Sequence, residues 1–274
     1  MMNTVIPRLA ALFGLLALAA CATPKVEPQP QVVPGYEGIQ DGEYFIEPVA
    51  AHHLTGNVPR QEVDFTGNEP AGSIVVDPYV RKLYYVLPGG RAMRYTVAVG
   101  RAGLGFRGNA TVNRKVEWPS WTPTANMIRT QPELYADYAG GLPGGLINPL
   151  GARALYLYRN GKDTFYRIHG TRENSSIGRA TSAGCIRLFN QDAIDLFNRV
   201  DLGTRVHVRG REESERLEGK WMDDENGHLI PYDAAMIAEI EARREAIEAQ
   251  KAADEAAAAA TAAAAAEAGT TTQG

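Results

Sequence analysis

The sequence predicts one folded domain that is mainly β with a few short helices. Runs of β-branched and aromatic residues alternate with Gly, Pro and Asn turn signals between residues 73 and 209. Helical patterns within this stretch are few and short. The flanking segments are poor core material, because residues 21–70 are rich in Pro and residues 210–274 are charged and then Ala-rich. A domain of roughly 130–150 residues is a common size.

Each strand is expected where such a run lies between turn signals. The expected strands are 73–76, 82–87, 95–99, 111–117, 155–158, 165–169 and 205–209. Asn160 and Gly161 form the dipeptide that favours a tight hairpin turn between two of these strands.

Two short helices are expected among the strands. Residues 130–133 read Thr-Gln-Pro-Glu, which fits a capping box, so a helix is expected to run to about Tyr138. Asn190 is suited to cap a second helix. One face of that helix carries Ala193, Ile194, Phe197 and Val200.

Overall composition excludes some classes of protein. The 274 residues are 45% hydrophobic and 22% charged, which is ordinary for a globular protein and argues against a fully disordered chain. Lys and Arg number 28 against 32 Asp and Glu, so the formal net charge is −4. Since nucleic-acid binders usually carry a basic domain, we expect no nucleic-acid partner.

Residues 103–108 match the G-x-G-x-x-G pattern after a predicted strand. A dinucleotide site also needs a helix that begins at the third glycine, whose N-terminus binds the phosphates. The residues that follow read as a turn and then a strand. We therefore interpret this stretch as a Gly-rich loop between strands.

The N-terminus resembles a bacterial lipoprotein signal peptide over residues 1–20. Residues 9–19 are an apolar run of 11 residues, too short to span a bilayer as a helix. Leu-Ala-Ala precedes Cys21, as in a lipobox, which implies a lipid anchor on Cys21. The alternative is an ordinary secretory signal with a chance Cys. Either interpretation places the chain on the periplasmic side of the cell envelope, and Ala22 favours the outer membrane.

Residues 21–70 are interpreted as a Pro-rich tether with local structure near residues 44–46, and residues 210–274 as a helical or disordered tail. His52 and His53 lack further metal ligands nearby in the sequence and are interpreted as surface residues. Binding of the tail to a helix of a partner protein is an alternative to a solvated tail.

Cys185 is the candidate nucleophile and His169 its candidate base. A free thiol is mostly protonated at neutral pH, so a Cys nucleophile needs a nearby base such as an imidazole. Gly184 leaves room for a carbonyl to approach, and the backbone N–H groups of Ala183, Gly184 and Cys185 are suited to an oxyanion hole. From residue types alone, a buried structural Cys remains the stronger alternative.

The residues His169-Gly170-Thr171 and Ser182-Ala183-Gly184-Cys185-Ile186-Arg187-Leu188 resemble the active-site block of the L,D-transpeptidases of bacterial cell walls, which have a YkuD-type catalytic domain. The resemblance covers residues 73–209 and implies a β-sandwich-like catalytic domain with short helices. Residues 118–124 and 126–145 are similar, more loosely, to the region that covers the substrate in that family.

The resemblance implies a role for each residue of the block. Cys185 is the nucleophile, His169 the base, and the Gly170 carbonyl orients the imidazole. Arg187 belongs to the site architecture or binds a substrate carboxylate, with a structural salt bridge as the alternative. Ser182 and Thr171 support the site. Many members have His at the position of Ala183, so Ala183 receives no side-chain role.

The implied reaction is a peptidoglycan transpeptidation. Cys185 forms a thioester with a tetrapeptide stem, D-Ala leaves, and an amine accepts the acyl group to give a 3→3 crosslink. Hydrolysis, as L,D-carboxypeptidase or endopeptidase, and attachment of an envelope protein to peptidoglycan are alternatives, because they share one acyl-enzyme. A non-catalytic wall-binding protein is a further alternative. No metal or other cofactor is expected.

Overall fold

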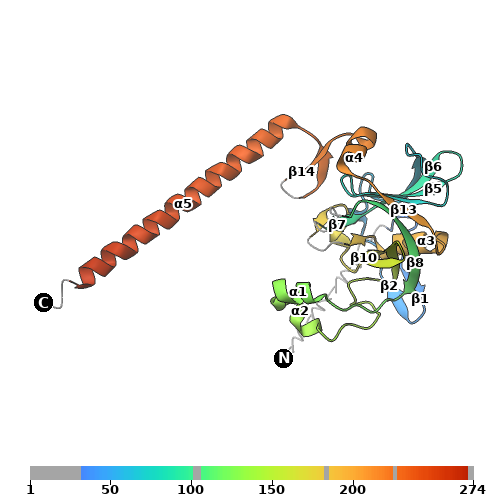
Figure 1. The fold of residues 1–274 in the computed structure, drawn as a ribbon, viewed down its shortest axis with the longest axis horizontal. Coiled ribbons are helices and arrows are strands. Elements are labelled where there is room, and N and C mark those ends of the chain that lie inside the picture. Colours follow the sequence, from blue (N-terminus) through green and yellow to red (C-terminus); the bar gives the residue numbers. More distant parts are fainter. Residues whose placement is uncertain (1–31, 101–105, 182–184, 225–226, 271–274) are drawn as a thin grey trace, which may run out of the picture. The chain divides into compact units, whose positions relative to one another are not determined.

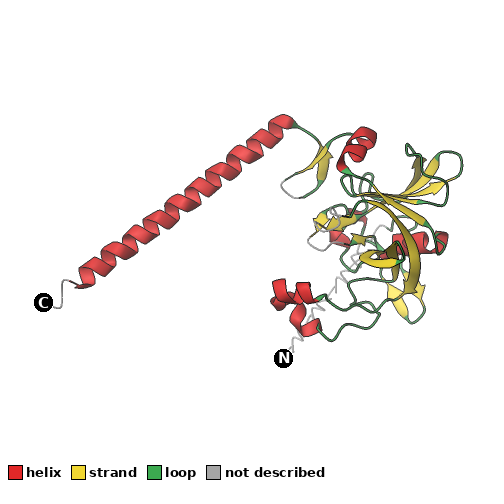
Figure 2. Cartoon of the chain, in the orientation of Figure 1, coloured by secondary structure: helices red, strands yellow, loops and turns green. Residues whose placement is uncertain are grey.

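An eleven-stranded mixed sheet forms the body of the protein (Figures 1 and 2). The computed structural model describes residues 32–100, 106–181, 185–224 and 227–270. The strand order is β11-β7-β12-β10-β9-β8-β13-β4-β5-β6-β3. The mainly β domain with short helices is therefore as the sequence predicts, and six of its strands coincide closely with the expected runs.

The strands are β1 (Ile39–Asp41), β2 (Tyr44–Ile46), β3 (Gln61–Asp64), β4 (Ile74–Asp77), β5 (Lys82–Leu87), β6 (Arg91–Thr96), β7 (Ala98–Gly100), β8 (Gly108–Glu117), β9 (Arg153–Arg159), β10 (Lys162–His169), β11 (Ala180–Thr181), β12 (Ile186–Arg187), β13 (Arg205–Val208), β14 (Trp221–Asp223) and β15 (Leu229–Pro231). The α-helices are α1 (Ala125–Thr130), α2 (Pro132–Tyr135), α3 (Asn190–Arg199), α4 (Arg211–Glu218) and α5 (Ala234–Thr270), and the 3-10 helices are η1 (Ala51–His53), η3 (Ala136–Tyr138) and η4 (Asn174–Ser176).

Sheet pairing follows from local turns in some places and from long-range contacts in others. Asn160 and Gly161 both have positive φ, 51° and 74°, and close the β9–β10 hairpin as predicted. β10 pairs in parallel with β12, and β13 pairs in parallel with β4. Since parallel neighbours need a crossover connection, these pairs bring distant parts of the chain together.

The main hydrophobic core lies between the sheet and α3. Leu157 of β9, Ile168 of β10 and Ile186 of β12 are buried there beside Leu196 of α3. α3 packs on β9 and β10. The helix therefore supports the strands that carry the catalytic segment described below.

Residues 32–70 are part of the folded domain, which corrects the prediction of a tether over 21–70. Tyr36, Val49 and Leu54 are buried in a second cluster against Phe189. β3 extends the main sheet by pairing with β6. The buried apolar residues of this segment are few and widely spaced, so they form no periodic pattern that would predict folded structure in a Pro-rich stretch. Residues 21–31 lie outside the described residues, as does the signal segment 1–20.

The domain also continues beyond its predicted end at residue 209. The carboxylate of Asp77 in β4 accepts hydrogen bonds from Ser214 Oγ at 2.8 Å and from Arg209 at 3.3 Å. Arg209 also pairs with Glu218 at 2.8 Å. Because these groups are buried together, α4 is fixed to the sheet. Only α5 matches the expected helical tail, and its described side chains are nearly all exposed.

The predicted capping box begins six residues after the actual helix cap. Thr124 caps α1 by accepting the Met127 N–H at 3.2 Å, and Thr130 is the last residue of α1. α2 then begins at Pro132, and η3 continues the helical backbone to Tyr138, the predicted end. In the part of the chain that the structure describes, no helix combines the length and apolarity needed to cross a membrane.

Candidate active site

The parallel pairing of β10 and β12 brings His169 and Cys185 to one face of the sheet. Ile168 pairs with Ile186, and His169 pairs with Arg187. Ile168 and Ile186 point into the core, and side chains alternate along a strand. Cys185 directly precedes β12, so it lies diagonally from His169 on the face opposite the core. Continued by one residue, this register places Cys185 beside Arg167, and diagonal neighbours on adjacent strands are about 7–8 Å apart, within reach of a long or aromatic side chain.

The His169 imidazole is oriented by the backbone of the next residue. Its Nδ1 lies 2.6 Å from the Gly170 carbonyl oxygen, and the side chain is almost completely buried. Since that carbonyl is an acceptor, Nδ1 donates and carries the proton, which leaves Nε2 with a free lone pair. The imidazole therefore has the tautomer that a base at Nε2 requires.

Burial is the main cause that lowers the pKa of His169 to about 4. The positive charges of Arg187 and Arg167 lower it further. The carbonyls of Gly170 and Leu150 act in the opposite direction but do not compensate. The imidazole is accordingly neutral at physiological pH and available to accept a proton.

Cys185 forms no disulfide within the part of the chain that the structure describes, and the residue is half-buried. Burial of the sulfur raises its pKa, while a backbone hydrogen bond from Arg167 and the charges of Arg167 and Arg187 lower it by less. Both shifts favour the uncharged forms, a neutral thiol and a neutral imidazole, in the resting protein. This differs from a preformed thiolate and indicates that proton transfer accompanies attack on the substrate.

Asn190 packs its side chain against the backbone at Gly170 and Gly151, a contact that sequence reasoning missed. It is the first residue of α3 instead of its cap, and its Oδ1 accepts the Ala152 N–H at 2.9 Å. A Cβ on Gly170 would lie 2.2 Å from this oxygen, and one on Gly151 would lie 2.3 Å away. Glycine is therefore required at both positions. The two glycines at the strand ends are the sequence signal that could have indicated such a close approach.

Arg187 forms an ion pair with Glu173 at 3.1 Å, which is the structural alternative for this side chain. Thr171 is buried, and its Oγ1 accepts the Glu173 N–H at 3.0 Å. Thr171 thus positions Glu173, and Glu173 positions Arg187 beside the sheet face of His169. The Glu173 side chain is 56% exposed, so a substrate carboxylate could exchange with it at little cost.

The segment after β8 lies beside this face. Trp118 donates to Asp41 at 2.8 Å, and Asp41 in turn binds Arg153 through two hydrogen bonds. Arg172 donates to the Ile147 carbonyl at 3.3 Å, so the loop at Ile147 adjoins the loop that follows His169. Ile147 is 65% exposed, which leaves an apolar rim next to the catalytic segment.

Ser182, Ala183 and Gly184 lie outside the described residues, so the oxyanion hole remains a prediction. Cys21 also lies outside them. Among the residues with described side chains, no set of three metal-ligating groups includes His169 or Cys185.

A half-buried cysteine on the same sheet face as an imidazole held by a backbone carbonyl defines a candidate cysteine acyl-transfer site. A family model described as the L,D-transpeptidase catalytic domain, YkuD, matches residues 71–208, just over half of the chain. The chain belongs to this L,D-transpeptidase family.

Two relatives with L,D-transpeptidase names and one solved structure illustrate what the chain is similar to. "Probable L,D-transpeptidase ErfK/SrfK" of Escherichia coli K12 is 39% identical over 49% of this chain and 43% of its own length. "Putative L,D-transpeptidase in ATP synthase subunits region ORF 5" of Fuscovulum blasticum is 39% identical over 49% of this chain and 68% of its own. A Brucella melitensis crystal structure described as "a Probable carnitine operon oxidoreductase caia" is 48% identical, with a TM-score of 0.40, over 55% of this chain and 93% of that one. The chain spans about half the length of the E. coli and Salmonella relatives.

Proposed function

We propose that this protein is a peptidoglycan L,D-transpeptidase that uses Cys185 as its nucleophile. The observation that carries the proposal is the pairing of β10 with β12, which brings a neutral, carbonyl-oriented His169 to the same sheet face as Cys185. Family membership supports the choice of a peptidoglycan stem peptide as the substrate.

In the first half-reaction, Cys185 Sγ attacks the carbonyl that joins the L-centre of diaminopimelate to the terminal D-Ala. The thiol proton moves to His169 Nε2 as the S–C bond forms. The backbone N–H groups of Ala183, Gly184 and Cys185 are the proposed donors to the oxyanion. When the C–N bond breaks, Nε2 returns the proton to the departing amine, and D-Ala leaves a thioester on Cys185.

In the second half-reaction, an amine attacks the thioester and gives up a proton to His169. The proton passes to the sulfur as the C–S bond breaks, which restores the thiol. The side-chain amine of a second diaminopimelate gives the 3→3 crosslink that we propose as the product. A Lys amine of an envelope protein or a water molecule would give attachment or hydrolysis from the same thioester.

Incubation of the full chain with defined tetrapeptide muropeptides and mass analysis of the products tests this function. We expect loss of D-Ala together with a crosslinked dimer, and neither product from Cys185→Ala. Loss of D-Ala without a dimer would instead support the hydrolase alternative. Wall binding without turnover would support the non-catalytic alternative, and both outcomes would reject transpeptidation.

We also propose that Cys21 is lipidated after removal of residues 1–20 and tethers the domain to the periplasmic side of the envelope, in the outer membrane. Several acyl chains together give stable membrane attachment. Growth with labelled palmitate should label the wild-type protein in the membrane fraction. Retention of both label and membrane association by Cys21→Ala would contradict the anchor.

A further inference from the structure

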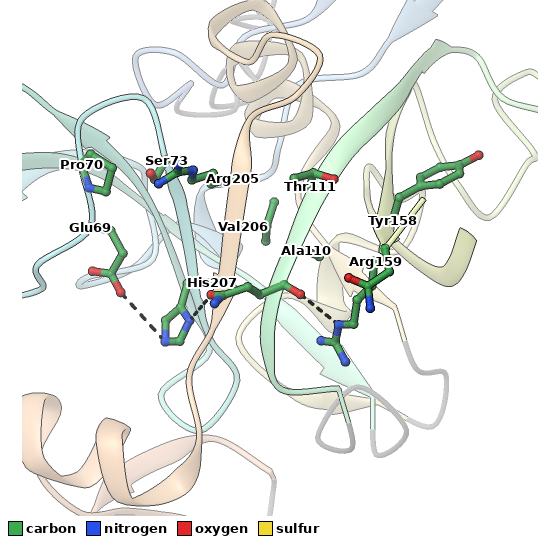
Figure 3. Close-up of a pocket in the computed structure, with 12 residues that line it drawn as sticks. Glu69, Pro70, Ser73, Ala110, Thr111, Tyr158, Arg159, Arg205, Val206 and His207 are labelled. Atoms are coloured by element: carbon green, nitrogen blue, oxygen red, sulfur yellow. Dashed lines mark hydrogen bonds and ion pairs between the residues drawn. The ribbon is translucent and has the colours of Figure 1, made fainter. Parts of the chain in front are cut away.

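A second group of polar side chains lies outside the catalytic segment. Glu69, from the loop between β3 and β4, and Glu213 of α4 flank His207 of β13, and one possible ligand atom from each lies within 4.8 Å of the others. The three side chains are 20–29% exposed. Glu69 and His207 help to line an open pocket of about 410 Å³, and Figure 3 shows their side chains pointing toward each other.

The distances fit ligands arranged around one ion. His207 Nε2 lies 2.9 Å from one Glu213 oxygen and 3.9 Å from a Glu69 oxygen. Zinc binds imidazole and carboxylate ligands at ~2.0–2.2 Å, which in a tetrahedral site separates the ligand atoms by roughly 3.3 Å. The observed separations lie on both sides of that value, so small side-chain rotations would complete the geometry.

The hydrogen bond made by Nδ1 of His207 determines that Nε2 is the ring nitrogen available to bind a metal. Nδ1 lies 2.9 Å from Oδ1 of Asn109. When Nδ1–H donates to this oxygen, Nε2 is the ring atom that faces Glu213 and Glu69, where it could bind a cation. Hydrogen bonding of the second ring nitrogen is also the usual support of a metal-bound His.

Glu69 supplies an independent observation. Its Oε2 is buried and has no hydrogen-bond partner in the described part of the chain. A buried, unsatisfied carboxylate oxygen is costly, and a cation bound to the same carboxylate, whose Oε1 faces His207, would reduce that cost. The two carboxylates carry a charge that a divalent ion balances, and the nitrogen ligand favours a transition metal over Ca²⁺ or Mg²⁺.

We propose that Glu69, His207 and Glu213 bind one Zn²⁺ ion, which links the β3–β4 loop, β13 and α4. The pocket beside Glu69 and His207 leaves a further coordination position open to water or a small anionic ligand. The ion would stabilise the folded chain by mass action, because the three ligands meet only in the native state.

Zinc titration of the tag-free, chelator-treated full chain tests the site. We expect the wild type and Cys185→Ser to bind one equivalent of Zn²⁺. The zinc affinity of His207→Gln and of Glu213→Gln should be at least tenfold lower. Asn109→Ala should weaken binding by about 10–100-fold. His228→Gln is the matched control, since His228 pairs with the single carboxylate of Asp224 at 3.3 Å and should bind as wild type does.

Melting temperatures of the metal-free variants show whether each still folds. If His207→Gln does not fold, Glu69→Gln decides, because Glu69 lies in a loop outside the sheet. Absence of bound zinc in the wild type would overturn the proposal. Wild-type zinc affinity in His207→Gln, or in Glu69→Gln if His207→Gln does not fold, would overturn it as well. The three side chains would then form an ion pair without a metal. Neither readout depends on transpeptidase activity.

Discussion

At the residue scale, the chemistry of His169 is determined by its burial and by the Gly170 carbonyl. A histidine with an unfolded pKa near 6.5 and a folded pKa of about 4 binds fewer protons in the native state. Stability from this group is therefore present above about pH 6.5 and is lost as the pH falls toward 4.

His169→Gln should remove this pH dependence. We expect the unfolding free energy of the wild type, relative to the variant, to rise by roughly 3 kcal/mol from pH 4 to pH 6.5. Chemical denaturation at a series of pH values measures the difference. A flat difference across this range would mean that the imidazole is not desolvated.

The raised pKa of Cys185 predicts slow alkylation of the resting enzyme at neutral pH. The rate of iodoacetamide modification, measured from the intact mass of the protein, should rise only when the pH exceeds the ordinary pKa range of a thiol. Cys185→Ala provides the background rate. Rapid modification that is independent of pH down to pH 6 would show a preformed thiolate and contradict the neutral resting pair.

Asn190 should act on catalysis through the position of the Gly170 carbonyl. Asn190→Ala is expected to lower kcat by about tenfold or more with little change in KM, because misplacement of a catalytic group affects the chemical step. The acidic limb of the pH–rate profile of Asn190→Ala should also shift, because this limb reports the pKa of His169. Asn198→Ala, at the other end of α3, is the control. Unchanged kcat and pH profile in Asn190→Ala would assign this side chain a structural role only.

At the element scale, β-branched runs and turn residues made the strands between residues 73 and 209 predictable. Asn160 and Gly161 specify their hairpin locally, whereas the β10–β12 pairing joins segments that are separated by a long loop. No local pattern encodes that pairing, so His169 and Cys185 could be identified by resemblance but not brought together by the sequence alone. The packing of Tyr36 and Ser214 on the domain was not predicted, because an isolated buried residue gives no periodic pattern in the sequence.

The buried link between β4 and α4 predicts a large stability cost for its loss. Among the described residues, Asp77→Ala leaves buried Arg209 with Glu218 as its one charged partner and should destabilise the fold by about 3 kcal/mol in urea unfolding. Asp64→Ala removes a surface pair with Arg91 and should cost less than about 1 kcal/mol. Equal effects of the two substitutions would contradict a fixed α4.

At the scale of the whole molecule, the folded unit is larger than the segment that matches the family model. It includes residues 32–70 and α4, whereas α5 buries little. A chain that ends after Asp233 should therefore keep its melting temperature within about 2 °C, since exposed side chains contribute little to stability. Thermal unfolding of the two chains measures this. A loss of 10 °C or more would show that α5 packs on the domain.

The most direct test of the account is the mass of the acyl-enzyme itself. The full chain, mixed with a tetrapeptide muropeptide and quenched in acid, should gain the mass of the stem without its terminal D-Ala. Peptide mapping should locate that mass on Cys185, and His169→Gln should accumulate it far more slowly. An adduct on another residue, or turnover of the muropeptide by Cys185→Ala, would contradict the proposed nucleophile.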